Sequence, residues 1–399
     1  KEREMKLTEE TPFFFIYSVW TKNGEYREQV KRLVTDYDNY ISLKLAGDDA
    51  YLSEKMVGYP AELDEVYAES FEEQKKEWFS CVGDGIQECR NTWEHKKWNI
   101  TDFPEFELAI TIDRPELYYD FLQKDWTRFC HDYWKNNFLE HHTLSQKRVT
   151  RIYIGNQFCH NLFPRKELLF QVLEKALENN LAVTLAFSYI RNHLLEEIDE
   201  LLQELEVWCQ SREKEAGKDQ EEIIVNDWAM PILLQGKPHL KPVLGVLLNK
   251  RRKDVRLPYK QGIGNHVDSL AENNLNCGFY QDYLKNTFDI QRFEFESCGY
   301  KVTIPDGHHS LHLPFFQTNT SQYCTLYAVC RYGDRGKQKL PENCPRYCNK
   351  KVFLYPKHLK MVGRYNSLFG YDEKILWDEK QLQDYLEQGI DRIVVNVSL

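Results

Sequence analysis

The chain alternates short apolar runs with longer amphipathic segments from about residue 148 onwards. A run at 148–156, RVTRIYIGN, precedes the segment RKELLFQVLEKALENN at 165–180, in which apolar residues recur at helical spacing. The short apolar run predicts a buried strand, and the helical spacing predicts a helix with one buried stripe. The same two patterns return at 181–190 and 192–210. This region therefore predicts repeated strand–helix units.

Further strands are expected C-terminal to these units. They lie at 221–228, at 241–249, within 282–297, at 308–316, at 351–356 with a continuation through 362–366, and at 391–399. Strands that alternate with helices or long connections favour a parallel sheet with both faces covered. About eight such units in about 250 residues predict an α/β fold with a TIM-like (β/α)8 barrel over residues 148–399. A doubly wound open sheet is the alternative.

Residues 1–147 have a different pattern, dense in Trp, Tyr, Glu and Lys and without a repeating unit. Amphipathic helices are predicted at 23–45 and 116–140, and a strand at 103–112. We expect an N-terminal α+β module over 1–147 that packs on the barrel or binds a substrate or partner.

Composition restricts the classes of function. Hydrophobic residues make up 42% of the 399 residues and the formal net charge is −10, which is typical of a soluble globular protein and not of a nucleic-acid binder. The longest apolar runs are too short to span a bilayer, and the N-terminus shows no signal peptide. We therefore expect a cytoplasmic protein in a reducing compartment, where clustered cysteines indicate metal or redox chemistry more than disulfides.

The segment SQYCTLYAVCRYGDRGKQKLPENCPRYC is rich in cysteine. It contains Cys324, Cys330, Cys344 and Cys348. These residues follow one predicted strand and precede the next, and Cys159 follows the first predicted strand, so all five could meet at the C-terminal face of a barrel. The C-x3-C and C-x5-C spacings are looser than the usual paired hooks of a zinc site. A 4Fe–4S cluster accepts thiolates from separate segments, because each cysteine binds a different iron. Spacing alone leaves iron–sulfur and zinc open.

Histidine and aspartate candidates stand at two other predicted strand ends. The segment GHHSLH carries His308, His309 and His312, and IIVNDW carries Asp227. On a strand His308 and His312 share a side, and His312 lies nearest the strand end, where a substrate would bind. We interpret His308 and His309 as ordinary hydrogen-bonded or exposed histidines, and His312 and Asp227 as candidate catalytic residues. A helix cap is the alternative role for Asp227.

Four further residues are candidate substrate ligands. Asn226 precedes Asp227, and VGRYN supplies Arg364, Tyr365 and Asn366. Arg364 could hold a carboxylate through two parallel hydrogen bonds, and a structural ion pair is the alternative.

Several motifs together resemble a known family. LHLPFFQTNTSQYC and ENCPRYC resemble the HLP…S-x-Y-C segment and the C-x3-C of the collagenase-like peptidases, number thirty-two of the unassigned peptidase families. IYIGNQFC and VGRYNSLFGYDE are similar to one branch of that family, the smaller subunit of the oxygen-independent hydroxylase pair of ubiquinone biosynthesis. The resemblance covers about residues 148–399 and consists of short motifs in the right order.

The resemblance implies a barrel with a 4Fe–4S cluster on Cys159, Cys324, Cys344 and Cys348. Cys330 departs from the pattern and could replace Cys324. The implied activity is oxygen-independent hydroxylation or a related modification of a small organic substrate or a peptide.

Two other functions stay open at the level of the sequence. The first is a peptidase or peptide-modifying enzyme, although neither H-E-x-x-H nor G-x-S-x-G occurs. The second is a non-catalytic, cluster-bearing subunit that pairs with a second barrel chain.

Overall fold

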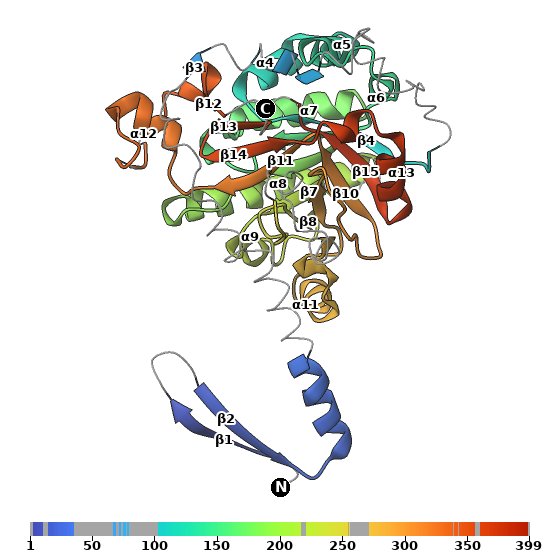
Figure 1. Ribbon diagram of the computed structural model, residues 1–399, viewed down its shortest axis with the longest axis vertical. Coiled ribbons are helices and arrows are strands. Elements are labelled where there is room, and N and C mark those ends of the chain that lie inside the picture. Colours follow the sequence, from blue (N-terminus) through green and yellow to red (C-terminus); the bar gives the residue numbers. More distant parts are fainter. Residues whose placement is uncertain are drawn as a thin grey trace, which may run out of the picture.

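The computed structural model describes a barrel, a second sheet and an N-terminal hairpin (Figure 1). The described residues are 3–10, 15–35, 67–68, 72, 75–76, 78–79, 103–216, 221–253, 255, 271–337, 339–341, 343–355 and 360–397. In this part of the chain no helix is long and apolar enough to cross a membrane.

Eight parallel strands form a nearly closed barrel. In spatial order they are β8 (Leu240–Leu244), β7 (Glu221–Val225), β6 (Ala182–Ala186), β5 (Arg151–Gly155), β4 (Glu107–Ile112), β15 (Ile390–Val395), β10 (His309–Leu313) and β9 (Glu294–Glu296). A single parallel bridge between Leu244 and Phe293 joins the first strand of this order to the last. The predicted TIM-like α/β fold is therefore confirmed.

Helices cover the outside of the barrel. They are α4 (Pro115–Gln123), α5 (Trp126–Asn136), α6 (Thr143–Gln146), α7 (Lys166–Glu178), α8 (Leu195–Ala216), α9 (Ala229–Leu233), α11 (Gly278–Phe288) and α13 (Glu379–Glu387). In α7 the buried residues Leu169, Val172, Leu173 and Ala176 form the stripe that its sequence predicts. The single helix expected at 116–140 is instead α4 and α5, because Asp125 accepts a hydrogen bond from the amide of Arg128 and begins a new helix.

A second, antiparallel sheet is built mainly from the segment inserted between β10 and β15, and β3 from the N-terminal part of the chain adds its edge. Its order is β11 (Phe315–Thr320), β14 (Ser367–Tyr371), β13 (Met361–Arg364), β12 (Lys351–Leu354) and β3 (Tyr67–Ala68), and α12 (Thr325–Tyr332) follows β11. The predicted barrel strand over 351–366 was wrong, since this segment forms the β12 and β13 strands of the inserted sheet.

The barrel strand that the prediction lacked is β4. It pairs with β5 and β15 in the barrel, although the sequence analysis placed this segment in the N-terminal module. Its residues ELAITI are buried from Leu108 to Ile112, as expected for a strand that is covered on both faces.

The N-terminal hairpin consists of β1 (Arg3–Glu10) and β2 (Phe15–Thr21), followed by a helix over 24–35. Figure 1 shows these elements apart from the barrel. The rest of the helix expected at 23–45 lies outside the described residues.

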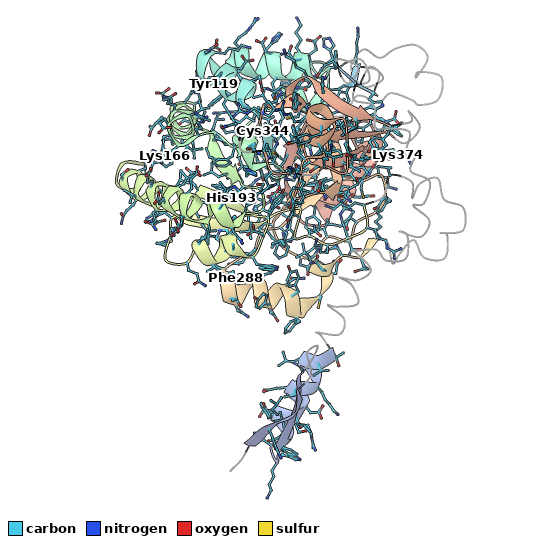
Figure 2. All side chains as sticks on the ribbon, turned by 90° about the vertical axis from the view of Figure 1, so that its left-hand side faces the viewer. Tyr119, Lys166, His193, Phe288, Cys344 and Lys374 are labelled. Carbon is cyan, nitrogen blue, oxygen red and sulfur yellow. The ribbon has the colours of Figure 1, made fainter. Side chains whose placement is uncertain are left out.

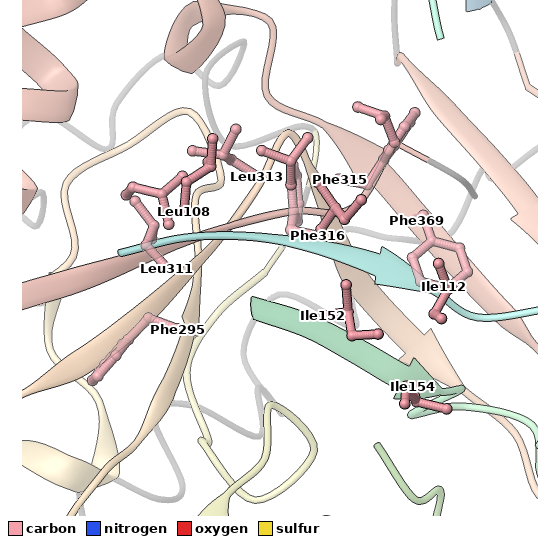
Figure 3. Packing of buried hydrophobic residues seen from close by; sticks show 14 of the residues in the cluster. Leu108, Ile112, Ile152, Ile154, Phe295, Leu311, Leu313, Phe315, Phe316 and Phe369 are labelled. Carbon is pink, nitrogen blue, oxygen red and sulfur yellow. The ribbon is translucent and has the colours of Figure 1, made fainter. Parts of the chain in front are cut away.

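The main core fills the space between the strands, the covering helices and the inserted sheet. Figure 3 shows strand residues such as Leu108, Ile152 and Leu311 packed near Phe315 and Phe369 of the inserted sheet. This shared core holds the inserted sheet against the barrel and therefore fixes the position of the segments that follow β10.

Charged side chains fill the lower part of the barrel interior, near the N-terminal ends of the strands. Arg392 donates to both carboxylate oxygens of Glu222, at 2.6 and 3.0 Å, and to Glu107 at 2.6 Å. Arg151 also donates to Glu107, at 2.9 Å. Because Arg392 and Glu222 are buried, this network is a structural ionic layer, and it accompanies a small apolar cluster of barrel residues that includes Ile224, Val243 and Val394.

Candidate metal centre and barrel mouth

Four cysteines from three segments line one small cavity at the C-terminal side of β5. Cys159 lies in the loop after β5, Cys324 precedes the first residue of α12, and Cys344 and Cys348 lie in the connection to β12. These four residues are the metal ligands that the family resemblance implies. All four thiols are free of disulfide bonds.

The loop that carries Cys159 has a fixed geometry. Gly155 ends β5 with φ of 108°, and a Cβ at this position would lie 2.6 Å from the carbonyl oxygen of Ala186 and 2.7 Å from the Phe163 ring. The side-chain oxygen of Asn156 then accepts hydrogen bonds from the amides of Phe158 and Cys159, both at 2.9 Å. These contacts turn the loop back over the barrel and direct Cys159 toward the inserted segment.

The inserted segment holds its cysteines through the β13–β14 hairpin. The Cys324 thiol donates to the carbonyl of Tyr365 at 3.0 Å and accepts from the amide of Tyr327 at 3.3 Å. The Arg364 Nε donates to the carbonyl of Cys348 at 3.1 Å. The turn of this hairpin therefore contacts two of the four cysteines directly.

Cys348 is buried and the other three cysteines are partly exposed, and the thiols interact with one another electrostatically. Burial raises the pKa of Cys159 to about 11 and the pKa of Cys348 to about 12, and burial raises the pKa of Cys324 further. The neighbouring thiols add to each of these pKa increases, and Cys344 contributes to all three. Sulfur atoms that influence each other in this way belong to one site.

The charge around the cavity is positive. Arg191 lowers the pKa of Cys159, and Arg364 lowers the pKa of Cys348, although burial outweighs both effects. No Asp or Glu is among the described residues that line the cavity. A set of thiolates would thus find positive charges nearby that stabilise it.

Cys330 lies elsewhere on α12. It does not line the cavity, and its thiol interacts with Lys351 and not with the other cysteines. Cys324 is therefore favoured over Cys330 as the candidate ligand that joins Cys159, Cys344 and Cys348.

The four cysteines can be compared with the ligand sets of a zinc ion and of a 4Fe–4S cluster, the two groups considered from the sequence. Zinc needs all its ligands about 2.3 Å from one point, and no group of three or more Cys, His, Asp or Glu among the described residues is arranged to hold a single ion. In a 4Fe–4S cluster each thiolate binds a different iron, so the sulfurs stand farther apart. The cavity measures about 20 Å³ for the centre of a water molecule, which leaves no room for an organic cofactor. Because the four thiols are not grouped around a single point, they fit a cluster with several metal atoms better than a zinc ion.

A wide groove opens beside the cysteine cavity. Its volume is about 1310 Å³, and it shares His160, Asn161, Pro341 and Cys344 with the cavity. In Figure 2 Cys344, His193 and Lys166, which line the groove, lie on the same side of the molecule. Phe163 and Phe187 stack at 4.3 Å between ring centroids and contribute apolar surface. The groove gives a substrate-sized molecule access to Cys344.

The candidate substrate ligands have different positions. Tyr365 and Asn366 line the cysteine cavity, and the Asn366 amide donates to the Tyr189 hydroxyl at 3.0 Å. Arg364 is buried behind Cys348 and donates to its backbone. Asn226 is buried and donates to the carbonyl of Phe187 at 2.8 Å. Arg364 and Asn226 therefore make backbone contacts and line neither the cavity nor the groove.

Asp227 accepts hydrogen bonds from the amides of Ala229 at 2.9 Å and Met230 at 3.2 Å, and from the amide of Ile190. This is the geometry of a helix cap at the start of α9. Three backbone donors occupy its carboxylate, and Asp227 lines none of the cavities described here.

The three histidines of GHHSLH also differ. His308 is exposed and contacts Asp391, and the buried His309 accepts a hydrogen bond from the amide of Phe293 at 3.2 Å. His312 is 3% exposed and lines a separate cavity at the mouth of the barrel. The strand alternation that separates His309 from His312 is therefore present in the structure.

Sequence reasoning missed Arg191, Tyr189 and Glu294. Arg191 and Tyr189 line the cysteine cavity, and their position shortly after β6 is the signal that could have identified them, since barrel sites form from such loops. Glu294 is a buried acid in the β9 strand EFE, and acidic residues that alternate with Phe in a predicted strand are the signal that could have identified it, since acids are rarely buried without a partner.

Comparisons with known proteins matched no family model, no curated protein and no solved structure. The barrel class therefore rests on the strand pairing alone, and the resemblance to the collagenase-like peptidase family stays a prediction.

Proposed function

We propose that this chain is an iron–sulfur protein whose barrel holds a 4Fe–4S cluster. Cys159, Cys324, Cys344 and Cys348 would be the ligands. The observation that carries the proposal is that four free thiols, brought from separate segments, line one enclosed cavity. Unrelated buried cysteines have no physical reason to gather at the C-terminal face of a barrel.

The chain's own residues prepare this site in two ways. Arg191 and Arg364 place positive charge beside sulfurs that must lose their protons on metal binding. The Asn156 and Tyr365 contacts fix the two segments that carry Cys159 and Cys324. When bound, a cluster supplies one-electron chemistry or a Lewis-acidic iron.

The reaction class that we propose is oxygen-independent hydroxylation or a related modification of an organic substrate. It is suggested by the family resemblance and supported by the groove, which joins an apolar floor to Cys344. A substrate in this groove would place one end beside the cysteine cavity. His160, which lines both spaces, stays neutral at physiological pH because burial and the charge of Arg191 lower its pKa to about 4.

A second candidate is a cluster-bearing subunit that works with another chain. Exposed apolar side chains on the hairpin and the helix that follows favour it, since such groups are common at interfaces. They include Leu7, Val19, Trp20, Leu33 and Val34. Copurification of a second chain, with activity only in the complex, would support this candidate.

The test of the main proposal is anaerobic purification followed by iron analysis and visible and EPR spectroscopy. We expect brown protein with about four irons per chain, and loss of most of the iron in Cys344→Ala. Cys130→Ala is the matched control, because Cys130 lies on α5 away from the cavity. A colourless, iron-free wild-type protein after anaerobic reconstitution would contradict the proposal.

A further inference from the structure

A second polar cavity lies at the mouth of the barrel. It is formed at the C-terminal ends of the strands and measures about 30 Å³ for the centre of a water molecule, which admits only a small ligand. Its lining includes Thr111, Asp113, Asn156, Glu296, His312 and Asn396. This is the position at which barrel enzymes place their reacting groups.

Buried residues fix the orientation of the His312 ring in this cavity through hydrogen bonds and packing. Its Nε2 lies 2.5 Å from the carboxylate of Glu294, and the other Glu294 oxygen accepts from the Tyr153 hydroxyl at 3.1 Å. Arg392 donates to the Tyr153 hydroxyl at 3.2 Å. Tyr153 also packs edge-on against His312, at 5.5 Å between ring centroids. The ring is thus fixed by a chain of buried groups that begins at the ionic layer.

The position of the hydrogen on the His312 ring depends on the ionisation state of Glu294. Burial opposes its ionisation, but the hydrogen bond and charge of His312 and the charge of Arg392 together lower the pKa of Glu294. An ionised carboxylate only accepts hydrogen bonds, so the His312 Nε2 carries the hydrogen. The charged ring carries a hydrogen on both nitrogens, and whenever the ring is neutral Nδ1 is a bare acceptor. Among the described residues Nδ1 has no protein partner, on a side chain that lines the cavity.

We propose that His312 is the acid–base residue of a second centre in the barrel mouth, which binds a neutral O–H or N–H group through the bare Nδ1. The bound group would be a hydroxyl, an amide or a water. In the proton transfer the O–H or N–H bond of the ligand breaks, its electron pair stays on the ligand, and a new N–H bond forms at Nδ1. Glu294 balances the positive charge that the ring gains. Glu294, Tyr153 and Arg392 are positioning residues, because they act through the ring.

The lining also excludes one class of ligand. Asp113 lines this cavity, and Glu296, which also lines it, is paired with Lys253. No Lys or Arg is among its described lining residues. An anion would meet the charge of Asp113 and could not donate to Nδ1. A neutral donor meets neither obstacle.

The second centre is separate from the cysteine cavity. The described linings of the two cavities share no residue, and Asn156 stands between them, since it lines the mouth and accepts from the amide of Cys159. The inference therefore does not rest on iron binding, and it is testable in metal-free protein.

The experiment is nitrogen NMR of the full chain labelled at histidine, with the His312 signals assigned by their loss in His312→Asn. We expect the neutral His312 ring to carry its hydrogen on Nε2 only. Acetamide and acetate are matched probes of similar size and opposite hydrogen-bonding character. Acetamide should shift the Nδ1 signal in a saturable way, and acetate at the same concentration should not.

Glu294→Gln and Glu294→Asp test the positioning role. We expect the Gln variant to show a mixture of the two ring tautomers and at least a tenfold weaker acetamide response, and the Asp variant to regain part of both. His309 is the internal control, because its Nδ1 accepts a hydrogen bond from the backbone amide of Phe293 and its tautomer should not change when Glu294 is replaced. A wild-type ring with its hydrogen on Nδ1, or an equal response to acetate and acetamide, would overturn the inference even if the Gln variant does not fold.

Discussion

Cys324 and Cys330 are equivalent candidates in the sequence, and their positions in the structure separate them. Both belong to the cysteine-rich segment, yet only Cys324 lines the cavity. Cys324 stands at the start of α12, where its thiol accepts the amide of Tyr327. Cys330 lies within the same helix and contacts other neighbours.

The first prediction separates these two residues. Cys324→Ser should lose most of the bound iron, because serine is a poor ligand for a cluster that thiolates assemble. Cys330→Ser should keep at least about nine-tenths of it, since Cys330 does not line the cavity. Iron analysis of both variants, purified side by side, measures the difference. The reverse pattern would assign the ligand role to Cys330.

The second prediction concerns Arg364, which lies behind Cys348 and not in a substrate pocket. Reduction adds negative charge to a cluster, and a buried cation nearby favours it. At an effective dielectric constant of about 20 and a distance of about 8 Å, one charge contributes about 2 kcal/mol. Arg364→Met should therefore lower the midpoint potential by roughly 50–100 mV, as measured by a spectroscopic redox titration.

Arg331→Met is the matched control for this measurement, because Arg331 is an exposed arginine of the same inserted region. Its midpoint should stay at the wild-type value. A wild-type midpoint in Arg364→Met as well would show that Arg364 acts through the backbone of Cys348 alone.

At the residue scale, sequence patterns selected side chains that line the two cavities but not the residues that support them. The cysteines and His312 were selected because their type and their place at strand ends limit what they can do. Arg364 was assigned to substrate because its side chain is a good carboxylate ligand, yet the hairpin turns it toward Cys348. Which partner an arginine meets depends on three-dimensional contacts that a one-dimensional pattern does not contain.

At the scale of elements, the end of β5 determines where Cys159 lies. Gly155 allows both a positive φ and the close approach of Ala186 and Phe163. Any side chain here would strain the backbone and push the loop away from the barrel.

The third prediction tests this element. Gly155→Ala should lower the free energy of unfolding by about 2–4 kcal/mol, from backbone strain together with overpacking. Gly236→Ala is the control, because Gly236 has φ of 79° but no atom near a new Cβ. Its cost should be nearer 1–2 kcal/mol, from strain alone. Urea unfolding of both variants measures the difference, and equal costs would show that the close contact at Gly155 is relieved by movement.

The β4 strand and the segment 351–366 explain the error in the predicted strand list. Both are short apolar runs, and a run of this length looks the same in a parallel barrel and in an antiparallel sheet. The β13–β14 turn at Tyr365, with φ of 57°, marks a hairpin, but Tyr is not a residue from which such a turn is expected. The barrel count of eight was therefore reached with one wrong member.

At the scale of the whole molecule, the ionic layer links strands that are far apart in the sequence. Glu222 on β7 bonds to Arg392 on β15 and to Arg151 on β5. Burial opposes the ionisation of Glu222, but Arg151 and Arg392 overcome it and lower its pKa to about 2.

The fourth prediction follows from the sign of this shift. Because the folded pKa of Glu222 lies below its ordinary value of 4.5, its stabilising contribution is full above about pH 4.5 and is lost as the pH falls toward 2. Glu222→Gln should cost about 3–5 kcal/mol at neutral pH, since it leaves buried arginines without their partner. Its stability should also fall less steeply than that of the wild type between about pH 4.5 and pH 2. Urea unfolding of the wild type and of Glu222→Gln across this pH range measures the two free energies of unfolding. If they changed in parallel with pH, Glu222 would not be ionised in the folded state.

The single bridge between Leu244 and Phe293 makes one side of the barrel wall different from the rest. Elsewhere adjacent strands are joined over several residue pairs, but here the Leu244 amide donates to the Arg292 carbonyl at 3.0 Å with little to reinforce it. Thermal fluctuations that part the wall should begin at this seam, so the Leu244 amide is expected to exchange its hydrogen for deuterium sooner than the amides in the middle of β5. The cysteine loop follows β5, in the tightly joined part of the wall, whereas Glu294, which contacts His312, stands on β9 beside the seam. Opening of the seam should therefore loosen the barrel mouth before it reaches the cysteine cavity.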